Sequence, residues 1–326
     1  MKTNLKILIF LSVFCFACHP VQEVSESPAL CDRACLEDFV DIFLEAVISR
    51  DPSKAPLAGE VRYTENGQLL HPGDGMWATA DGRGVFTLYV SDPVSGQVGF
   101  IGTIRENGIP AILGLRLKIE NMEISEAEAF VARDPKEARM LDSIGAPHPV
   151  FLEPIPVEER VSRDSLQFIA NLYFEGLERN DGKGYYPFTE DCNRIENGHY
   201  TTNSPKRGGG PMDIEGMTPK QQFESGFFSF VTRIRDRRFP IVDEERGIVY
   251  ALAFFDHAGT VPVITMTNGM RFPMNVLQPF TYQISEAFKI EKGQFREIQA
   301  LYREAPYGMG SGWTTPEQVL SSEPIY

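Results

Sequence analysis

The chain has 326 residues, of which 31 are lysine or arginine and 45 are aspartate or glutamate, giving a formal net charge of −14. A chain of this length exceeds what one compact core usually holds and favours about two domains. The acidic balance argues against a protein that binds nucleic acid or an anionic membrane surface.

The first residues predict a signal peptide over 1–17. Lys2 and Lys6 accompany an apolar run, Ile7 to Ala17, that is too short to span a bilayer. Cleavage after Ala17 would place Cys18 at the new N-terminus. The sequence therefore predicts export, either as an ordinary periplasmic protein or as a lipoprotein attached to a membrane through a lipid on Cys18.

Three cysteines follow the predicted signal peptide, namely Cys31, Cys35 and Cys192. An oxidising compartment favours one disulfide and one remaining thiol, and the sequence leaves open which two pair. No spacing typical of a metal site or of a nucleotide-binding loop occurs. We therefore expect neither a metal ion nor a cofactor.

The rest of the chain contains an internal repeat of two diverged copies. Apolar residues at helical spacing predict an amphipathic helix from Cys35 to Ser49, and the pattern returns 130 positions later as Leu166, Ile169, Tyr173 and Leu177. Tyr63–Gly67 matches Arg194–Gly198 at an offset of 131, and Lys118–Phe130 matches Lys289–Leu301 at an offset of 171. The second copy therefore carries about 40 additional residues, mainly around Lys206–Gly210 and in Thr260–Pro279.

Each copy also predicts an antiparallel meander, because alternating apolar runs are separated by short turns. The predicted strands are Gln97–Arg105, Ala111–Glu120 and Glu123–Val131, then Gly247–Phe255, Phe280–Ile290 and Gln294–Tyr302. The resulting domains are 28–133 and 162–304, joined by an extended, proline-rich linker over 134–161 and followed by a tail over 305–326 that is expected to add no secondary structure. The apolar loop Thr260–Pro279 is interpreted as a lid or an interface.

The order of helix, proline-marked turn, isolated strand and meander resembles the nuclear transport factor 2-like, or SnoaL-like, cone fold. The motifs that are similar to a bacterial and fungal family of unknown function are Tyr63–Gly67, Arg235–Pro240, Asp243–Gly247, Phe254–His257 and Pro306–Trp313. The resemblance implies an α+β fold of two cone-shaped domains, each a curved antiparallel sheet with packed helices. Relatives use the mouth of the cone for dehydration, isomerisation, epoxide opening, cyclisation or binding, and the fold does not choose among these.

The isolated strand of each copy carries a glutamate before an Asn-Gly turn. Alternation places Arg194 and Glu196 on one face with Cys192, as it places Tyr63 and Glu65 with Val61. The apolar members suggest that this face points inward, where a glutamate loses hydration and can act as a general acid or base. The alternative is structural, with the glutamates closing a strand end ahead of the turn.

Two further groups of charged residues are candidates for substrate binding and proton transfer. Arg235 and Arg238 belong to an arginine run that forms either a solvated ion-pair network on a helix end and loop or a fork that binds a substrate carboxylate. Asp256 and His257 form either a proton-transfer dyad or an incidental surface turn. We expect Arg194 and Glu196 to converge with His257 and with at least one of the two arginines.

These patterns predict an exported, cofactor-free enzyme of lyase, isomerase or hydrolase type that acts on a small carboxylated or hydroxylated organic substrate in the second copy. The rival hypothesis is a non-catalytic exported module for ligand binding or assembly, and the sequence leaves homo-oligomerisation open. The candidate catalytic residues are Arg194, Glu196, Asp256 and His257; the candidate substrate-binding residues are Asn197, Arg235, Arg238, Tyr63 and Glu65.

Export has a direct test. Mass spectrometry of the protein from its native host should find a chain that begins at or near Cys18, because the signal peptide is removed during export. Intact N-terminal peptides that contain Lys2 and Lys6 would contradict the prediction.

Overall fold

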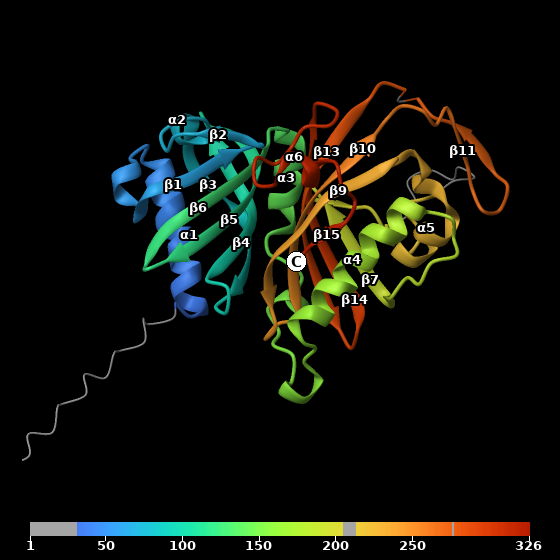
Figure 1. Cartoon of the computed structure of the whole chain (residues 1–326), viewed down its shortest axis with the longest axis horizontal. Coiled ribbons are helices and arrows are strands. Elements are labelled where there is room, and N and C mark those ends of the chain that lie inside the picture. Colours follow the sequence, from blue (N-terminus) through green and yellow to red (C-terminus); the bar gives the residue numbers. More distant parts are fainter. Residues whose placement is uncertain (1–30, 205–212, 276) are drawn as a thin grey trace, which may run out of the picture.

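The computed structural model describes residues 31–204, 213–275 and 277–326 and shows an α+β protein with two large sheets and few helices (Figure 1). The predicted signal peptide, Cys18 and the glycine-rich stretch 206–210 lie outside these residues. No helix in the described part of the chain is long and apolar enough to cross a membrane.

The first sheet has six strands in the order β2-β1-β6-β5-β4-β3. Its elements are α1 (Arg33–Ile48), β1 (Leu57–Glu65), β2 (Gln68–Leu70), α2 (Met76–Thr79), β3 (Ala80–Asp92), β4 (Gln97–Glu106), β5 (Ile109–Glu120) and β6 (Glu123–Ala132). The meander is antiparallel as predicted, but β1 pairs with β6 in parallel. The antiparallel meander is therefore confirmed, and the parallel pair of β1 with β6 makes the sheet as a whole mixed.

The second sheet has seven strands in the order β15-β9-β10-β13-β14-β7-β8. Its elements are α4 (Arg163–Arg179), β7 (Phe188–Glu196), β8 (His199–Tyr200), α5 (Pro219–Ser225), β9 (Arg233–Asp243), β10 (Ile248–His257), β13 (Phe280–Glu291), β14 (Gln294–Ala305) and β15 (Pro324–Ile325). Read from β8, this order matches that of the first sheet strand for strand, with β15 added at the far edge. The parallel pair of β7 with β14 corresponds to that of β1 with β6.

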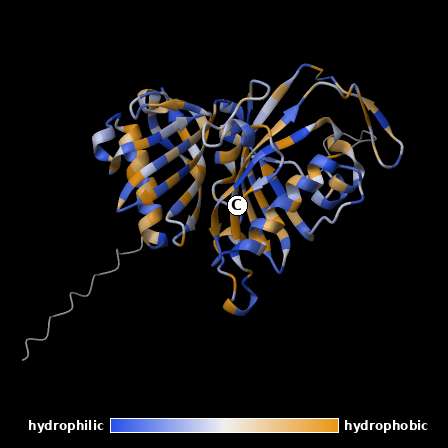
Figure 2. Cartoon of the chain, in the orientation of Figure 1, coloured by the Kyte–Doolittle hydropathy of each residue, from blue (hydrophilic) through white to orange (hydrophobic). Residues whose placement is uncertain are grey.

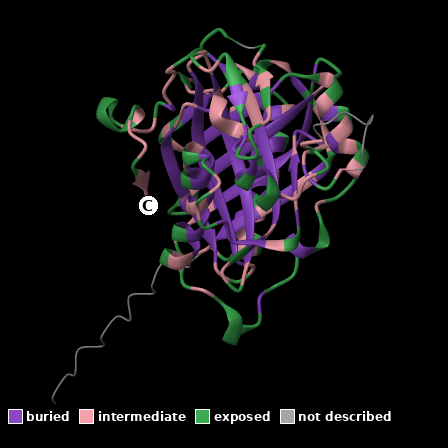
Figure 3. Cartoon of the chain, turned by 90° about the vertical axis from the view of Figure 1, so that its right-hand side faces the viewer, coloured by how far each residue is buried: buried purple, intermediate pink, exposed green. Residues whose placement is uncertain are grey.

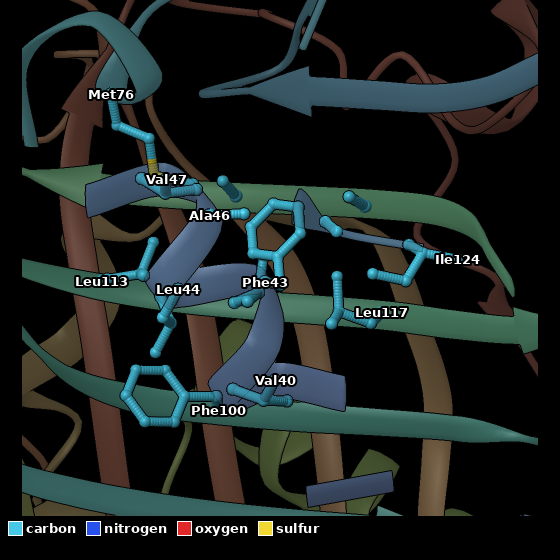
Figure 4. Packing of buried hydrophobic residues seen from close by; sticks show 14 of the residues in the cluster. Val40, Phe43, Leu44, Ala46, Val47, Met76, Phe100, Leu113, Leu117 and Ile124 are labelled. Atoms are coloured by element: carbon cyan, nitrogen blue, oxygen red, sulfur yellow. The ribbon is translucent and has the colours of Figure 1, made fainter. Parts of the chain in front are cut away.

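Helix α1 covers the outer face of the first sheet. The helix starts at an N-cap, Asp32, whose side chain accepts from the backbone N–H of Cys35 at 2.9 Å. A disulfide joins Cys31 to Cys35 in this first turn, and Cys192 is the free, buried cysteine of the described part. Apolar residues recur along α1 (Figure 2), and the close-up shows its buried stripe packed on β4, β5 and β6 (Figure 4).

The two sheets pack face to face on their other sides, so the long strands are buried on both faces (Figure 3). Tyr250 crosses this interface, where its hydroxyl accepts a hydrogen bond from Ser285 at 2.6 Å. A Cβ at Gly99 would stand 2.8 Å from the Tyr250 ring, so glycine is what lets the ring approach the first sheet. Helices α1 and α4 lie on the outer sides of this pair of sheets.

The segment between the sheets is not the extended linker predicted from its prolines. It forms α3 (Pro135–Ile144) and the short 3-10 helices η2 (Pro149–Phe151) and η3 (Val157–Glu159). Asp134 caps α3 by accepting from the backbone N–H groups of its first turn. Ala138, Leu141 and Phe151 join the core between the sheets, and burial of these side chains outweighs the extended preference of the prolines.

The strand β9 carries the arginine run that was expected on a helix end and loop. Charges are tolerated there because they are paired: Glu128 of β6 accepts from Arg238 at 2.7 and 2.9 Å and from Arg116 at 3.0 Å. Glu128 is 2% exposed. This ion-pair group, Arg116–Glu128–Arg238, joins the two sheets.

The tail also crosses from one sheet to the other. Trp313 donates its indole N–H to Thr64 at 2.9 Å, and its ring stacks with the guanidinium groups of Arg62 and Arg116 at 4.6 Å each. Beyond it, α6 (Pro316–Val319) and β15 follow, and β15 pairs with β9. The prediction of a tail without new secondary structure was therefore wrong.

Replacing Glu128 by glutamine should lower the free energy of unfolding by about 3 kcal/mol, because it removes the carboxylate that Arg116 and Arg238 share and leaves Arg238 with Asp236 alone. Urea unfolding of the wild type and of Glu128→Gln measures the difference. The matched control is Glu123→Gln at an exposed position of the same strand, which should change stability by less than about 0.5 kcal/mol. Equal effects of the two variants would show that the ion-pair group does not hold the sheets.

Candidate functional site

A cavity of about 250 Å³ lies in the second half, between α4 and the outer face of its sheet. The lining comes from α4, from the strands β7, β10, β13 and β14, and from the 3-10 helix η4 (Phe227–Phe230). The lining residues are Tyr173, Leu177, Arg194, Glu196, Phe228, Phe230, Val231, Phe255, His257, Tyr282, Ile284 and Tyr302. The structure thus brings Arg194, Glu196 and His257 to one cavity, which we call the aromatic pocket.

Arg194 is fixed in place at the polar end of the aromatic pocket. Its Nε donates to Glu196 at 3.1 Å and to Thr201 at 3.0 Å, and its terminal nitrogens donate to Tyr173 at 3.2 Å and to Gln222 at 2.8 Å. The guanidinium is buried, and its pKa lies above the ordinary value because the neighbouring Glu196 and Tyr173 outweigh the cost of burial. The charge of Arg194 is therefore permanent.

Glu196 is the carboxylate that faces the aromatic pocket. About a quarter of its side chain (25%) is exposed, whereas its counterpart in the first half, Glu65, is 6% exposed. The ion pair with Arg194 orients Glu196 and leaves its second oxygen free to accept a proton. In this geometry Glu196 can serve as a general base.

Glu286, on β13, is a functional candidate that the sequence analysis missed. It is 1% exposed, and Oε2 has no hydrogen-bond partner in the described part of the chain. Burial, followed by the charge of Glu196, raises the pKa of Glu286 to about 8, and Tyr173 hydrogen-bonds to it. Glu286 therefore holds a proton at neutral pH directly behind the pocket wall.

A signal for Glu286 was present in the sequence. Tyr282, Ile284 and Phe288 alternate on the inward face of β13, and a glutamate within that apolar series is unusual. The corresponding position of the first half, 171 residues earlier, is Leu115. A polar residue that replaces an apolar one in the second copy marks the half that carries a site.

His257 lies at the other end of the aromatic pocket, stacked on Phe280 with ring centroids 4.3 Å apart. Its Nδ1 is 3.1 Å from the carbonyl oxygen of Phe255, and because a carbonyl only accepts, Nδ1 carries the proton. Burial lowers the pKa of His257 to about 4. The imidazole is therefore neutral at physiological pH and a weak base for proton shuttling.

Asp256 does not form a dyad with His257. Adjacent residues of a strand point to opposite faces, and the Asp256 carboxylate accepts from Arg235 at 2.8 Å and from Thr281 at 2.7 Å away from the aromatic pocket. Arg235 and Arg238 do not line the pocket either, since Arg238 binds Glu128 between the sheets. The predicted convergence of these arginines with Glu196 was wrong.

Asn197 also has a structural role. It adopts a left-handed φ of 49° in the turn before β8, and its side chain bonds the backbone of Tyr302 at 2.9 and 3.0 Å. Its counterpart Asn66 (φ 53°) bonds the backbone of Val131 in the same way. A turn conformation that asparagine tolerates, rather than substrate contact, accounts for both residues.

The interior of the first half is filled by side chains. Phe43 packs on the buried Trp77 with ring centroids 5.2 Å apart, where the second half has Tyr173 at the position of Phe43. Tyr63, the counterpart of Arg194, donates to Glu65 at 3.1 Å. Glu65 also accepts from the backbone of Met76 at 2.6 Å, so these residues support α2 rather than a pocket.

The loop Thr260–Pro279 borders the site. It contains a small hairpin, β11 (Val263–Thr265) with β12 (Arg271–Pro273), in which Ile264 and Met266 are buried. The backbone N–H of Thr267 donates to Ser225 at the end of α5, and β11 packs on η4. The hairpin thereby supports the side of the aromatic pocket that Phe228 and Phe230 form.

In a comparison with known protein families, the segment that contains this site matches one family model. Residues 159–302 match the model of a family described as a domain of unknown function (DUF8021). All residues that line the aromatic pocket fall within this segment. No curated protein matches the chain. Fold and site thus define an α+β protein of two large sheets whose second half is similar to that family.

Replacing Glu286 by glutamine should change how stability depends on pH. The folded protein holds the Glu286 proton up to about pH 8, whereas an unfolded glutamate releases it near its ordinary pKa of 4.5. Wild-type stability therefore falls between these values as pH rises, by at most about 1.4 kcal/mol per pH unit from this group. The Glu286→Gln variant lacks this loss, so its free energy of unfolding should rise relative to that of the wild type as the pH increases.

Urea unfolding at pH 5, 6, 7 and 8 measures the difference between the two proteins. Glu304→Gln, at an exposed position of β14, is the control and should run parallel to the wild type. A Glu286→Gln variant that also runs parallel would show that Glu286 ionises normally.

Proposed function

We propose that the protein is an exported, cofactor-free enzyme of lyase, isomerase or hydrolase type that uses the aromatic pocket for acid–base chemistry on a small carboxylated or hydroxylated organic substrate. The first half would serve as scaffold. The observation that supports this proposal best is the arrangement of two carboxyl groups in contrasting environments, Glu196 and Glu286, around Arg194 and Tyr173.

Two neighbouring carboxyls with different environments are suited to opposite roles in proton transfer. Glu196 faces the pocket and is oriented by its ion pair with Arg194, so it would remove a proton from the substrate. Tyr173 lines the pocket with its hydroxyl between Arg194 and Glu286, so it would donate a hydrogen bond to negative charge that develops on the substrate. Glu286 would act through Tyr173 as a positioning residue.

The proposed fold family rests on the order of elements. Helix α4 and the strands from β7 to β14 repeat the order of α1 and the strands from β1 to β6, as expected for tandem cones of the nuclear transport factor 2-like type. Export is supported by the N-terminal sequence and by the Cys31–Cys35 disulfide, since disulfides persist in oxidising compartments.

A binding module without catalysis is the second candidate. It is favoured by His257, whose low pKa makes it a weak base, and by the aromatic lining, which is typical of ligand sites. The two functions differ in what the loss of one carboxylate would do.

Glu196→Gln should lower kcat by at least about a hundredfold, because glutamine fills the same space but cannot take a proton. The affinity for the ligand should stay within severalfold of the wild-type value. A screen of small acids, sugars and aryl compounds would supply the substrate, and kcat and KM would then be measured separately. Glu190→Gln, exposed on the same strand, is the matched control. Full turnover in Glu196→Gln would leave the binding module as the better account.

A further inference from the structure

The charges at the polar end of the aromatic pocket are already balanced. Arg194 contributes one positive charge and Glu196 one negative charge, and their atoms lie 3.1 Å apart. Arg194 also donates to Tyr173, Thr201 and Gln222, so its guanidinium is held by protein acceptors. Arg194 is the cation that the described part of the chain contributes to the lining, and it is already compensated, so a bound carboxylate would enter this buried site at a cost.

The walls of the aromatic pocket consist mainly of aromatic side chains. Phe228, Phe230, Phe255, Tyr282 and Tyr302 line it. Its volume of about 250 Å³ falls below the roughly 300 to 1,000 Å³ of pockets for drug-sized molecules. Aromatic walls favour an apolar or aromatic ring through offset and edge-to-face contacts. The space therefore suits a ligand with a single ring.

One wall atom is left to accept a hydrogen bond at the far end. The Nδ1–H of His257 donates to the carbonyl of Phe255 at 3.1 Å, and the ring is clamped by Phe280 at 4.3 Å and Tyr282 at 5.0 Å. The ring therefore cannot turn freely to exchange its nitrogens. Nε2 therefore carries no proton and receives no hydrogen bond from the described part of the chain, so it can accept one from a ligand hydroxyl.

We infer that the aromatic pocket takes an uncharged single-ring alcohol or phenol, with the ring among the aromatic walls and the hydroxyl donating to Nε2 of His257. This inference narrows the proposed substrate class and rests on the proposed use of the same pocket. His257 is then the residue that distinguishes a hydroxylated ring from the bare ring, and the Arg194–Glu196 pair disfavours the carboxylated analogue.

The test compares four probes on the full-length mature protein by ligand-observed NMR titration: benzyl alcohol, benzyl methyl ether, toluene and benzoate. Benzyl alcohol should bind more tightly than benzyl methyl ether, which cannot donate, by about threefold to tenfold, the value of one hydrogen bond. Benzoate should bind more weakly than benzyl alcohol. Crystals soaked with benzyl alcohol should place its ring in the aromatic pocket.

His257→Phe supplies the matched variant, because phenylalanine preserves the stacking on Phe280 and removes the acceptor. It should reduce the affinity for benzyl alcohol to that for benzyl methyl ether and leave toluene unchanged. Equal wild-type affinities for the alcohol and the ether, or tighter binding of benzoate, would overturn the inference, and the wild-type comparison holds even if the variant fails to fold. Selective binding without turnover of any such alcohol would instead count against the proposed catalysis alone.

Discussion

The long strands of this protein are covered on both faces, by a helix on one side and by the other sheet on the opposite side. Successive residues along a strand therefore enter two different buried environments. On β10, His257 reaches the aromatic pocket and Asp256, its neighbour, reaches an ion pair with Arg235. This alternation decides which polar residues can meet a ligand and which serve to join the structure.

Charges between the sheets must be paired, because burial removes their hydration. Glu128 meets Arg116 and Arg238 there, and Trp313 of the tail stacks on Arg116 from the outside. Arg238, one arginine of the run that looked like a substrate fork, thus joins the two halves, whereas Arg235 pairs with Asp256 within the second sheet. A basic cluster in an acidic protein marks an internal interface in this case.

The two halves share an order of elements but differ in what fills them. In the first half Phe43, Trp77 and Leu115 pack the interior of the sheet. In the second half Tyr173 and Glu286 take the positions of Phe43 and Leu115, and the hairpin of β11 and β12 supports the open side. Arg194 also takes the position of Tyr63, and these polar side chains do not fill the interior as their counterparts do, so a cavity remains.

The sequence by itself determined the periodic features: the helices α1 and α4, the two meanders and the turns at Asn66 and Asn197, because hydrophobic spacing and turn chemistry are local properties. It also placed Arg194 and Glu196 on one face of β7. Three features needed the tertiary structure. The parallel pairing of β1 with β6 joins residues far apart in the chain. The arginines of β9 are tolerated in a buried strand because Glu128, Asp256 and Glu178 pair with them. Glu286 stands out in the sequence as a glutamate within an apolar alternation, but its raised pKa comes from burial beside Glu196, and that neighbour lies far away in the chain.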